Sequence, residues 1–174
     1  QPSMEMARVA AHSIVMVGPI LVAFLLTHSI MLLGSEIGDI QSRNWLLYAL
    51  FTTFATDTSA FLIGSIYGRH RLAPSISPNK TLEGAFGGFA GSVLVSVSLT
   101  YLLQLPLSLF TAIWFGLLLG VMGQLGDLLE SYIKRIFDVK DTGNILPGHG
   151  GLLDRIDSLV VNIPVVYYLV LFIV

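Results

Sequence analysis

The chain has 174 residues, of which 54% are hydrophobic and only 11% are charged. An ordinary soluble domain is about 25% charged, so this composition cannot cover a water-exposed surface and indicates a membrane protein. The net charge is −2 and no basic segment stands apart from acidic ones, which argues against a nucleic-acid partner. There is no cysteine, which excludes disulfides and thiolate metal sites.

Five apolar segments are each predicted to cross the lipid bilayer as a helix. The first, residues 9–35, has no charged residue and exceeds the roughly 20 residues that a membrane-spanning helix needs. Its histidines, His12 and His28, are predicted to be hydrogen-bonded structural groups rather than ligands. Residues 34–44 are polar and are predicted to form a short loop.

The second helix is predicted to begin near Trp45 and to end near Tyr67. Trp45 and Tyr48 suit the aromatic belt at a membrane interface. Asp57 lies in mid-span, where a carboxylate costs at least about 2.5 kcal/mol, so it is expected to face a polar cavity. A protonated or hydrogen-bonded structural role is the alternative for Asp57.

Residues 68–88 form the first polar cluster. Pro74 and Pro78 forbid a regular helix through it. Thr81 is placed to cap the helix that follows, and the exposed amides at that helix start, with Lys80 beside them, form a natural phosphate seat. An ordinary basic loop at the cytoplasmic face would explain the arginines of this segment equally well.

The third and fourth helices are predicted over residues 83–103 and from residue 109 to about 137, joined by a tight reversal. The third is rich in small residues, which allow close helix packing. The fourth leaves the membrane carrying Asp127, Glu130 and Lys134 at positions i, i+3 and i+7, which is one face of a helix.

The fifth helix is predicted to begin at Leu152 and run to the end of the chain. Asp154 and Asp157 fall on one side of its first turns. Favourable interaction of acids with a helix start is the alternative account of this pair, but it does not explain why the fourth helix brings Asp127 to the same region. With five spans, the loops after the second and fourth helices lie on one side of the membrane and hold most of the bases, which predicts that this side is cytosolic.

Half of all charged residues lie between residues 127 and 157, in a segment with six acids and four bases. Acids would repel a nucleotide triphosphate unless some of them held Mg²⁺, which prefers hard oxygen ligands. Two metals could also clamp an in-line displacement. The bases would then stabilise phosphates, and glycines would let the backbone approach closely. His149 could orient a phosphate or shuttle a proton, with a structural hydrogen bond as the alternative.

The residues of this segment also follow a recognisable order: Ser131, Ile133, Lys134, Arg135, Lys140, Asp141, Gly143, Leu146, Pro147, His149, Gly150, Gly151, Asp154, Arg155 and Asp157. This pattern resembles the signature of the phosphatidate cytidylyltransferases, or CDP-diacylglycerol synthases. The upstream run SISPNKTLEG is similar to the family's SPKKT-E-G segment, with Asn79 where a second lysine is usual, which leaves Lys80 to act.

The resemblance covers roughly residues 45–174 and implies an all-α, polytopic integral membrane bundle with about five transmembrane helices and two cytosolic polar loops. Residues 1–174 would be a single catalytic domain without the N-terminal helices of the full-length enzyme. The implied reaction transfers CMP from CTP to phosphatidic acid, giving CDP-diacylglycerol and pyrophosphate, with Mg²⁺ and with a second cation as a further option. The implied setting is the lipid bilayer of a bacterial cytoplasmic membrane, with the site facing the cytosol, and a homodimer is compatible with it.

The resemblance also assigns roles by motif position. The expected metal ligands are Asp127, Asp154 and Asp157. The expected catalytic residues are Lys134, Arg135, Lys140, Asp141, His149, Arg155 and Asp157. The expected substrate-binding residues are Asp57, Ser77, Lys80, Thr81, Glu83, Gly150 and Gly151.

Two other functions remain open at the level of sequence. A CTP-dependent kinase of a lipid alcohol would release CDP instead of pyrophosphate. A transporter or ion channel is suggested by the carboxylate at Asp57 in mid-membrane. It would show flux across sealed vesicles and no response to CTP.

Overall fold

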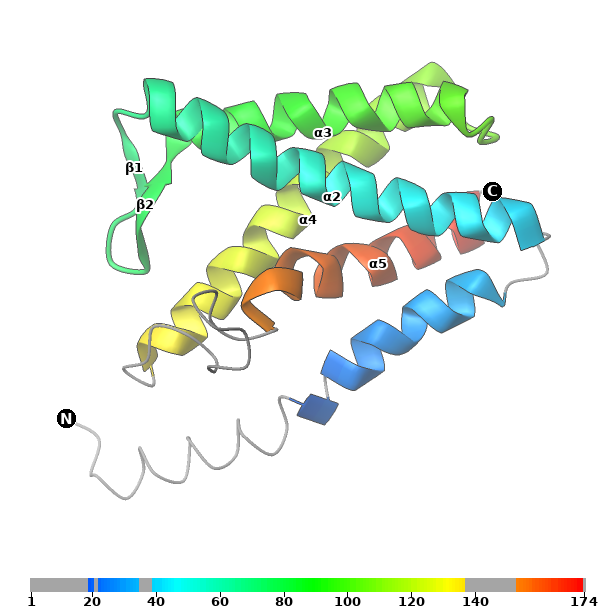
Figure 1. Ribbon diagram of the computed structural model, residues 1–174, viewed down its shortest axis with the longest axis horizontal. Helices are drawn as coiled ribbons and strands as arrows, with labels where there is room; N and C mark the ends of the chain where they lie inside the picture. Colours follow the sequence, from blue (N-terminus) through cyan, green and yellow to red (C-terminus); the bar gives the residue numbers. More distant parts are fainter. Residues whose placement is uncertain (1–18, 21, 35–38, 137–152, 174) are drawn as a thin grey trace.

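The computed structural model describes residues 19–20, 22–34, 39–136 and 153–173. Figure 1 shows long helices packed together and a short β-hairpin at one end of them. The elements are α2 (Asp39–Tyr67), β1 (Arg71–Ala73), β2 (Ser77–Thr81), α3 (Leu82–Leu102), α4 (Leu109–Ile136) and α5 (Leu153–Ile173). A shorter apolar helix, Val22–Leu33, precedes them. The predicted helices over residues 83–103 and 109–137 are thus confirmed almost to the residue.

Three of these helices are long and apolar enough to cross a membrane: residues 41–67 of α2, all of α3 and all of α4. Large apolar side chains lie on the outer surface of the bundle, among them Phe61 at 73%, Phe110 at 70% and Phe172 at 78% exposed. In water this surface would be unfavourable, whereas in lipid it is the normal exterior. The prediction of a helical integral membrane protein is confirmed, and three such spans lie among the described residues. The total of five spans stays a prediction.

Glycines set the spacing between α2 and α3. A methyl group added at Gly84 of α3 would lie 2.8 Å from the carbonyl oxygen of Ala60 and 3.1 Å from the Cα of Gly64, both on α2. No side chain larger than hydrogen fits there without moving one helix. The predicted role of small residues in close helix packing is therefore confirmed.

The start of α2 corrects two predictions. The helix begins at Asp39, so residues 39–44 are helical rather than part of a loop. Trp45 and Tyr48 are both 0% exposed and pack edge to face in the core, with ring centroids 5.7 Å apart, so they do not form an interfacial belt. The helix extends because its polar first turns find partners inside the protein: the side-chain amide of Asn44 donates to the carbonyl of Leu103 at 3.1 Å.

Polar side chains inside the bundle pair with one another. The amide of Asn162 on α5 donates to the hydroxyl of Thr53 on α2 at 2.9 Å. His28, on the helix Val22–Leu33, hydrogen-bonds through Nδ1 to the carbonyl of Phe24 at 3.1 Å and packs against Tyr167 of α5. The structural role predicted for His28 is confirmed, whereas His12 lies outside the described residues.

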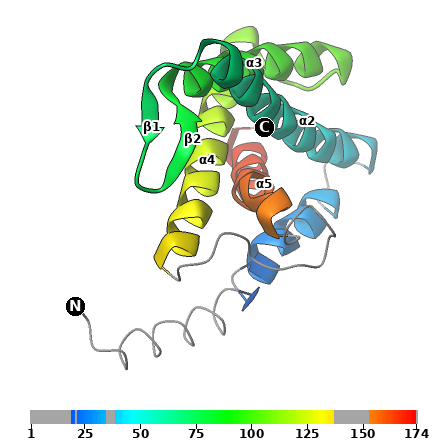
Figure 2. The ribbon, with the colours of Figure 1, turned by 60° about the vertical axis from the view of Figure 1, so that its left-hand side comes forward.

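The hairpin is the part of the fold that an all-α prediction did not include. Strand β1 pairs antiparallel with β2, with Arg71 opposite Thr81 and Ala73 opposite Ser77. The prolines do exclude a helix here, as predicted, because Pro74 lies in the turn and Pro78 in β2. Figures 1 and 2 show the hairpin projecting from the junction of α2 and α3 and lying beside α4, which β2 contacts.

Candidate active site

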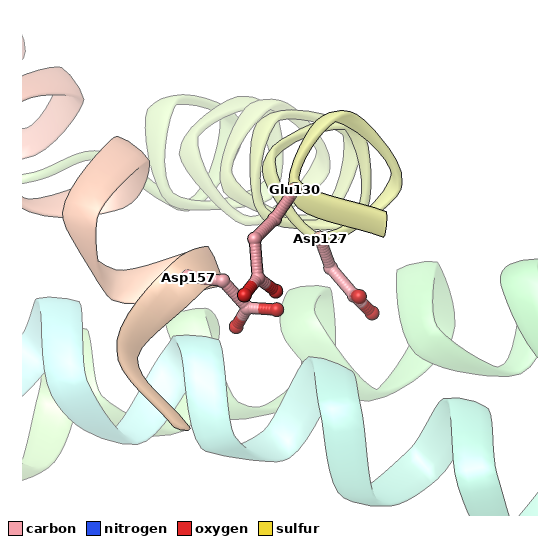
Figure 3. Close-up of side chains that lie close together, drawn as sticks. All are labelled: Asp127, Glu130 and Asp157. Atoms are coloured by element: carbon pink, nitrogen blue, oxygen red, sulfur yellow. The ribbon is translucent and has the colours of Figure 1, made fainter. Parts of the chain in front are cut away.

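Three carboxylates from two helices converge at one end of the bundle. Asp127 and Glu130 are one turn apart on α4, and Asp157 lies near the start of α5. One oxygen from each lies within 4.8 Å of the others. Figure 3 shows the three side chains pointing into the same space between the helices. These residues are called the acidic cluster below.

Two glycines of α4 allow α5 to approach closely enough to complete this cluster. A methyl group at Gly126 would lie 2.7 Å from Cγ2 of Val161 and 3.3 Å from the carbonyl oxygen of Asp157. One turn earlier, a methyl group at Gly123 would lie 2.8 Å from the amide nitrogen of Asn162. The position of Asp157 therefore depends on backbone contact between α4 and α5.

A fourth carboxylate, Asp57 of α2, lies beside this cluster. The hydroxyl of Ser158 donates to Asp57 at 3.5 Å, and the backbone amide of Ser158 donates to its neighbour Asp157 at 2.7 Å. Asp57 also lines a cavity, as the sequence predicted for a carboxylate in mid-span. One serine thus connects the acid of α2 to an acid of the cluster.

Two lysines offset part of this negative charge. Nζ of Lys80, from β2, lies 2.6 Å from Oδ2 of Asp127, and Nζ of Lys134 lies 3.2 Å from Oε2 of Glu130 on the same helix. Four carboxylates face two ammonium groups, so these side chains carry a formal excess of two negative charges. A carboxylate set with this excess fits a divalent cation with oxygen preference, such as Mg²⁺.

A cavity of about 590 Å³ opens beside the acidic cluster, between α2, α3, α4 and the hairpin. Its polar wall includes Asp57, Lys80, Asp127 and Gln124, and its apolar wall includes Phe61. The remaining lining residues are Ala60, Gly64, Ser65, Gly68, Arg71, Leu72, Asn79, Thr81, Gly84 and Ala85. The cavity is large enough for a small-molecule ligand and joins charged to apolar surface.

The sequence of the chain matches a known protein family. The sequence profile of the cytidylyltransferase family matches residues 3–173, which is nearly the whole chain. The chain belongs to the cytidylyltransferase family.

Curated members of the family include bacterial enzymes named phosphatidate cytidylyltransferase. The protein of Staphylococcus aureus strain COL is 44% identical over 131 residues, which cover 75% of this chain and 50% of that protein. The protein of Staphylococcus haemolyticus strain JCSC1435 is 43% identical over 128 residues, covering 74% of this chain and 49% of that protein. This cytidylyltransferase chain therefore spans about half the length of the curated relatives it matches.

The structure brings together several of the residues that the sequence singled out. Asp57, Lys80, Asp127 and Asp157 lie at the cavity or in the acidic cluster, and Lys134 joins them through Glu130. Thr81 lines the cavity and caps α3, because its hydroxyl accepts the backbone N–H of Gly84 at 3.1 Å. The capping role predicted for Thr81 is confirmed.

Other predicted residues lie farther from the acids. Nε of Arg135 donates to the carbonyl of Ile76 in the hairpin turn at 3.1 Å, and Glu83 bonds to the residues that precede β1. Ser77 begins β2 and is half-buried. Lys140, Asp141, His149, Gly150 and Gly151 lie outside the described residues, as do the side chains of Asp154 and Arg155. The roles assigned to these seven residues stay predictions.

Two residues of the site were not assigned by sequence reasoning. Glu130 is a member of the acidic cluster, and its side chain is only 11% exposed. Its i, i+3 spacing from Asp127 was the signal that could have identified it as a ligand. Gln124 lines the cavity and donates to the carbonyl of Ala85 at 3.2 Å, and no motif pointed to it.

Proposed function

We propose that this chain is the catalytic part of a phosphatidate cytidylyltransferase, which transfers CMP from CTP to phosphatidic acid and releases pyrophosphate. The observation that carries the proposal is the acidic cluster, with Lys80 against it, at a cavity inside an apolar helical bundle of the cytidylyltransferase family. The names of the staphylococcal relatives supply the substrate.

Asp127, Glu130 and Asp157 would hold Mg²⁺, with Asp154 as the additional ligand expected from sequence. Their oxygens are the ligand type that Mg²⁺ prefers, and the local excess of negative charge favours a divalent ion. When bound, the ion would neutralise phosphate oxygens and the developing charge of the leaving group.

In the proposed reaction, a phosphate oxygen of phosphatidate attacks the α-phosphorus of CTP. A new bond forms between these atoms while the bond from the α-phosphorus to the bridging oxygen breaks, and pyrophosphate leaves with that electron pair. The attacking phosphate is already ionised near neutral pH, so this chain needs to supply position and positive charge rather than a strong base. Lys80 and Arg71, both at the cavity, are the bases placed to attract phosphates.

The cavity has both apolar and charged walls, which suits an amphipathic substrate such as a lipid with a phosphate headgroup. Phe61 and Leu72 offer apolar contact on the side of α2 and β1, whereas Lys80 and Asn79 offer donors on β2. A lipid phosphate could reach the acids from the membrane while CTP enters from water. We propose that this water-facing end lies in the cytosol, because the end of the bundle that holds the hairpin and the last turns of α4 carries five of the nine bases of the chain: Arg69, Arg71, Lys80, Lys134 and Arg135.

The test is a product assay in detergent with labelled CTP, phosphatidate and Mg²⁺. We expect CDP-diacylglycerol and pyrophosphate in equal amounts, and a loss of at least about 100-fold in Asp157→Asn, which keeps the shape but removes a charge from the cluster. Ser98→Ala, on the exposed side of α3, is the control and should retain full activity. Release of CDP would identify a lipid kinase instead, and full activity of Asp157→Asn would remove this residue from the site.

A further inference from the structure

The β-hairpin carries Lys80 to the acidic cluster, yet it is too small to be stable alone. Strand β1 has three residues and β2 has five, and isolated two-stranded hairpins are marginal even when longer. The position of the Lys80 ammonium therefore depends on what anchors the hairpin to the helices.

The base of the hairpin is anchored by one carboxylate, Glu83, in the first turn of α3. Oε2 of Glu83 accepts the backbone N–H groups of Arg69 and His70 at 3.1 and 3.2 Å. Oε1 accepts Nδ1 of His70 at 2.6 Å. A carboxylate can only accept, so Nδ1 is the protonated ring nitrogen in this contact. Both oxygens of Glu83 are thus engaged with the segment that joins α2 to β1.

Glu83 does not touch the space where substrate would bind. It is not among the described residues that line the cavity, although Lys80 and Thr81, three and two positions earlier, both are. Its carboxylate instead contacts His70, whose side chain is 73% exposed. These contacts favour a structural role for Glu83, while the substrate-binding role expected from the sequence stays a prediction.

We propose that Glu83 is a positioning residue that fixes the base of the β1–β2 hairpin and thereby holds the Lys80 ammonium against Asp127. Arg135, which donates to the carbonyl of Ile76, anchors the turn at the other end of the hairpin. With both ends held, Lys80 is presented at the edge of the acidic cluster. If the base of the hairpin were released from Glu83, the Lys80 ammonium could move away from the acidic cluster.

A cross-linking experiment tests the position directly, without substrate or metal. The chain has no cysteine, so Lys80→Cys with Asp127→Cys in the full chain creates a unique thiol pair that a short bismaleimide can bridge. Glu83→Ala should slow cross-linking about fivefold, because three hydrogen bonds are lost. Glu83→Gln keeps an oxygen for the backbone N–H groups and should restore the rate to within about twofold. Ser98→Ala, near the other end of α3, should change nothing.

Turnover with CTP and phosphatidate gives the second readout, and only this readout rests on the proposed function. Glu83→Ala should lower kcat about tenfold in the natural sequence, but less than about twofold when Lys80→Met is already present, because residues acting through one another are not additive. Additive losses, or equal damage from Glu83→Gln and Glu83→Ala, would overturn the proposal. So would an unchanged cross-linking rate in Glu83→Ala. A chain without any turnover would refute the proposed function, and the cross-linking result would still decide the role of Glu83.

Discussion

The ammonium of Lys80 lies where a bound cation would also have to interact. Its Nζ is 2.6 Å from Asp127, one of the three acids that would hold Mg²⁺. Because ammonium and metal compete for the same oxygen, we expect Lys80→Met to tighten binding of a divalent cation in the absence of nucleotide. Methionine keeps most of the side-chain length and removes the charge.

The size of this effect follows from the exposure of the pair. Two unit charges 4 Å apart interact by about 1 kcal/mol in water and by about 4 kcal/mol at an effective dielectric constant of 20. The side chains of Lys80 and Asp127 are 24% and 33% exposed, so solvent screens them and the lower part of this range applies. A gain of about 1 to 2 kcal/mol corresponds to roughly 5- to 30-fold tighter binding.

Titration with Mn²⁺, followed by electron paramagnetic resonance in detergent without nucleotide, measures this change. Arg43→Met is the matched control, because it also deletes a positive charge but lies near the other end of α2. Its cation affinity should equal that of the unaltered chain. Unchanged or weaker Mn²⁺ binding by Lys80→Met would refute the competition. The difference between the two variants should shrink as salt is raised, because screening weakens exposed pairs.

Two further predictions concern single residues. Glu130→Gln should weaken Mn²⁺ binding at least about tenfold, since it removes one ligand charge of the acidic cluster, whereas Glu83→Gln, the same change outside the cluster, should leave the affinity within about twofold. Equal affinities in the two variants would exclude Glu130 as a ligand. Gln104 has φ of 52° in the turn after α3, a left-handed conformation that glycine adopts without strain, so Gln104→Gly should raise the stability by about 1 kcal/mol. Thermal unfolding in detergent measures this, with Ser98→Gly, inside α3, expected to lower the stability by a similar amount; a lower melting temperature for Gln104→Gly would contradict the reasoning.

The hydropathy pattern predicted the bounds of the helices well where apolar segments alone determine where a helix begins and ends. The bounds of α3 and α4 differ by a residue or so from the predicted ones, because apolar runs and the reversal between them are local features. The start of α2 was wrong for the opposite reason. Trp45 and Tyr48 have one polar group each, which suits an interface or a polar partner in the core, and sequence cannot tell these apart. The structure gives Tyr48 a core partner, the hydroxyl of Ser96.

The candidate site was predictable where its residues share a helix and less so where they meet across the fold. Helical spacing placed Asp127 and Lys134 on one face, and the same spacing should have added Glu130. The contact of Lys80 with Asp127 joins residues that are 47 positions apart in the sequence. The contact of His70 with Glu83 joins the residue before β1 to the first turn of α3. No periodicity encodes such pairs. These contacts depend on the hairpin. From Pro74 and Pro78 we predicted only that this segment is not helical, and we did not predict the two strands.

The acids of the site do not hold themselves together. Three carboxylates within 4.8 Å of one another repel, so the acidic cluster costs free energy that other contacts must offset. The close packing of α4 against α5 at Gly123 and Gly126 helps to offset this repulsion, because it fixes the backbone at Asp157 whatever the charge of the side chains. Lys80 and Lys134 offset part of the remaining repulsion. Helix packing therefore determines where the acids lie, while the lysines and the proposed cation determine how well that arrangement is tolerated.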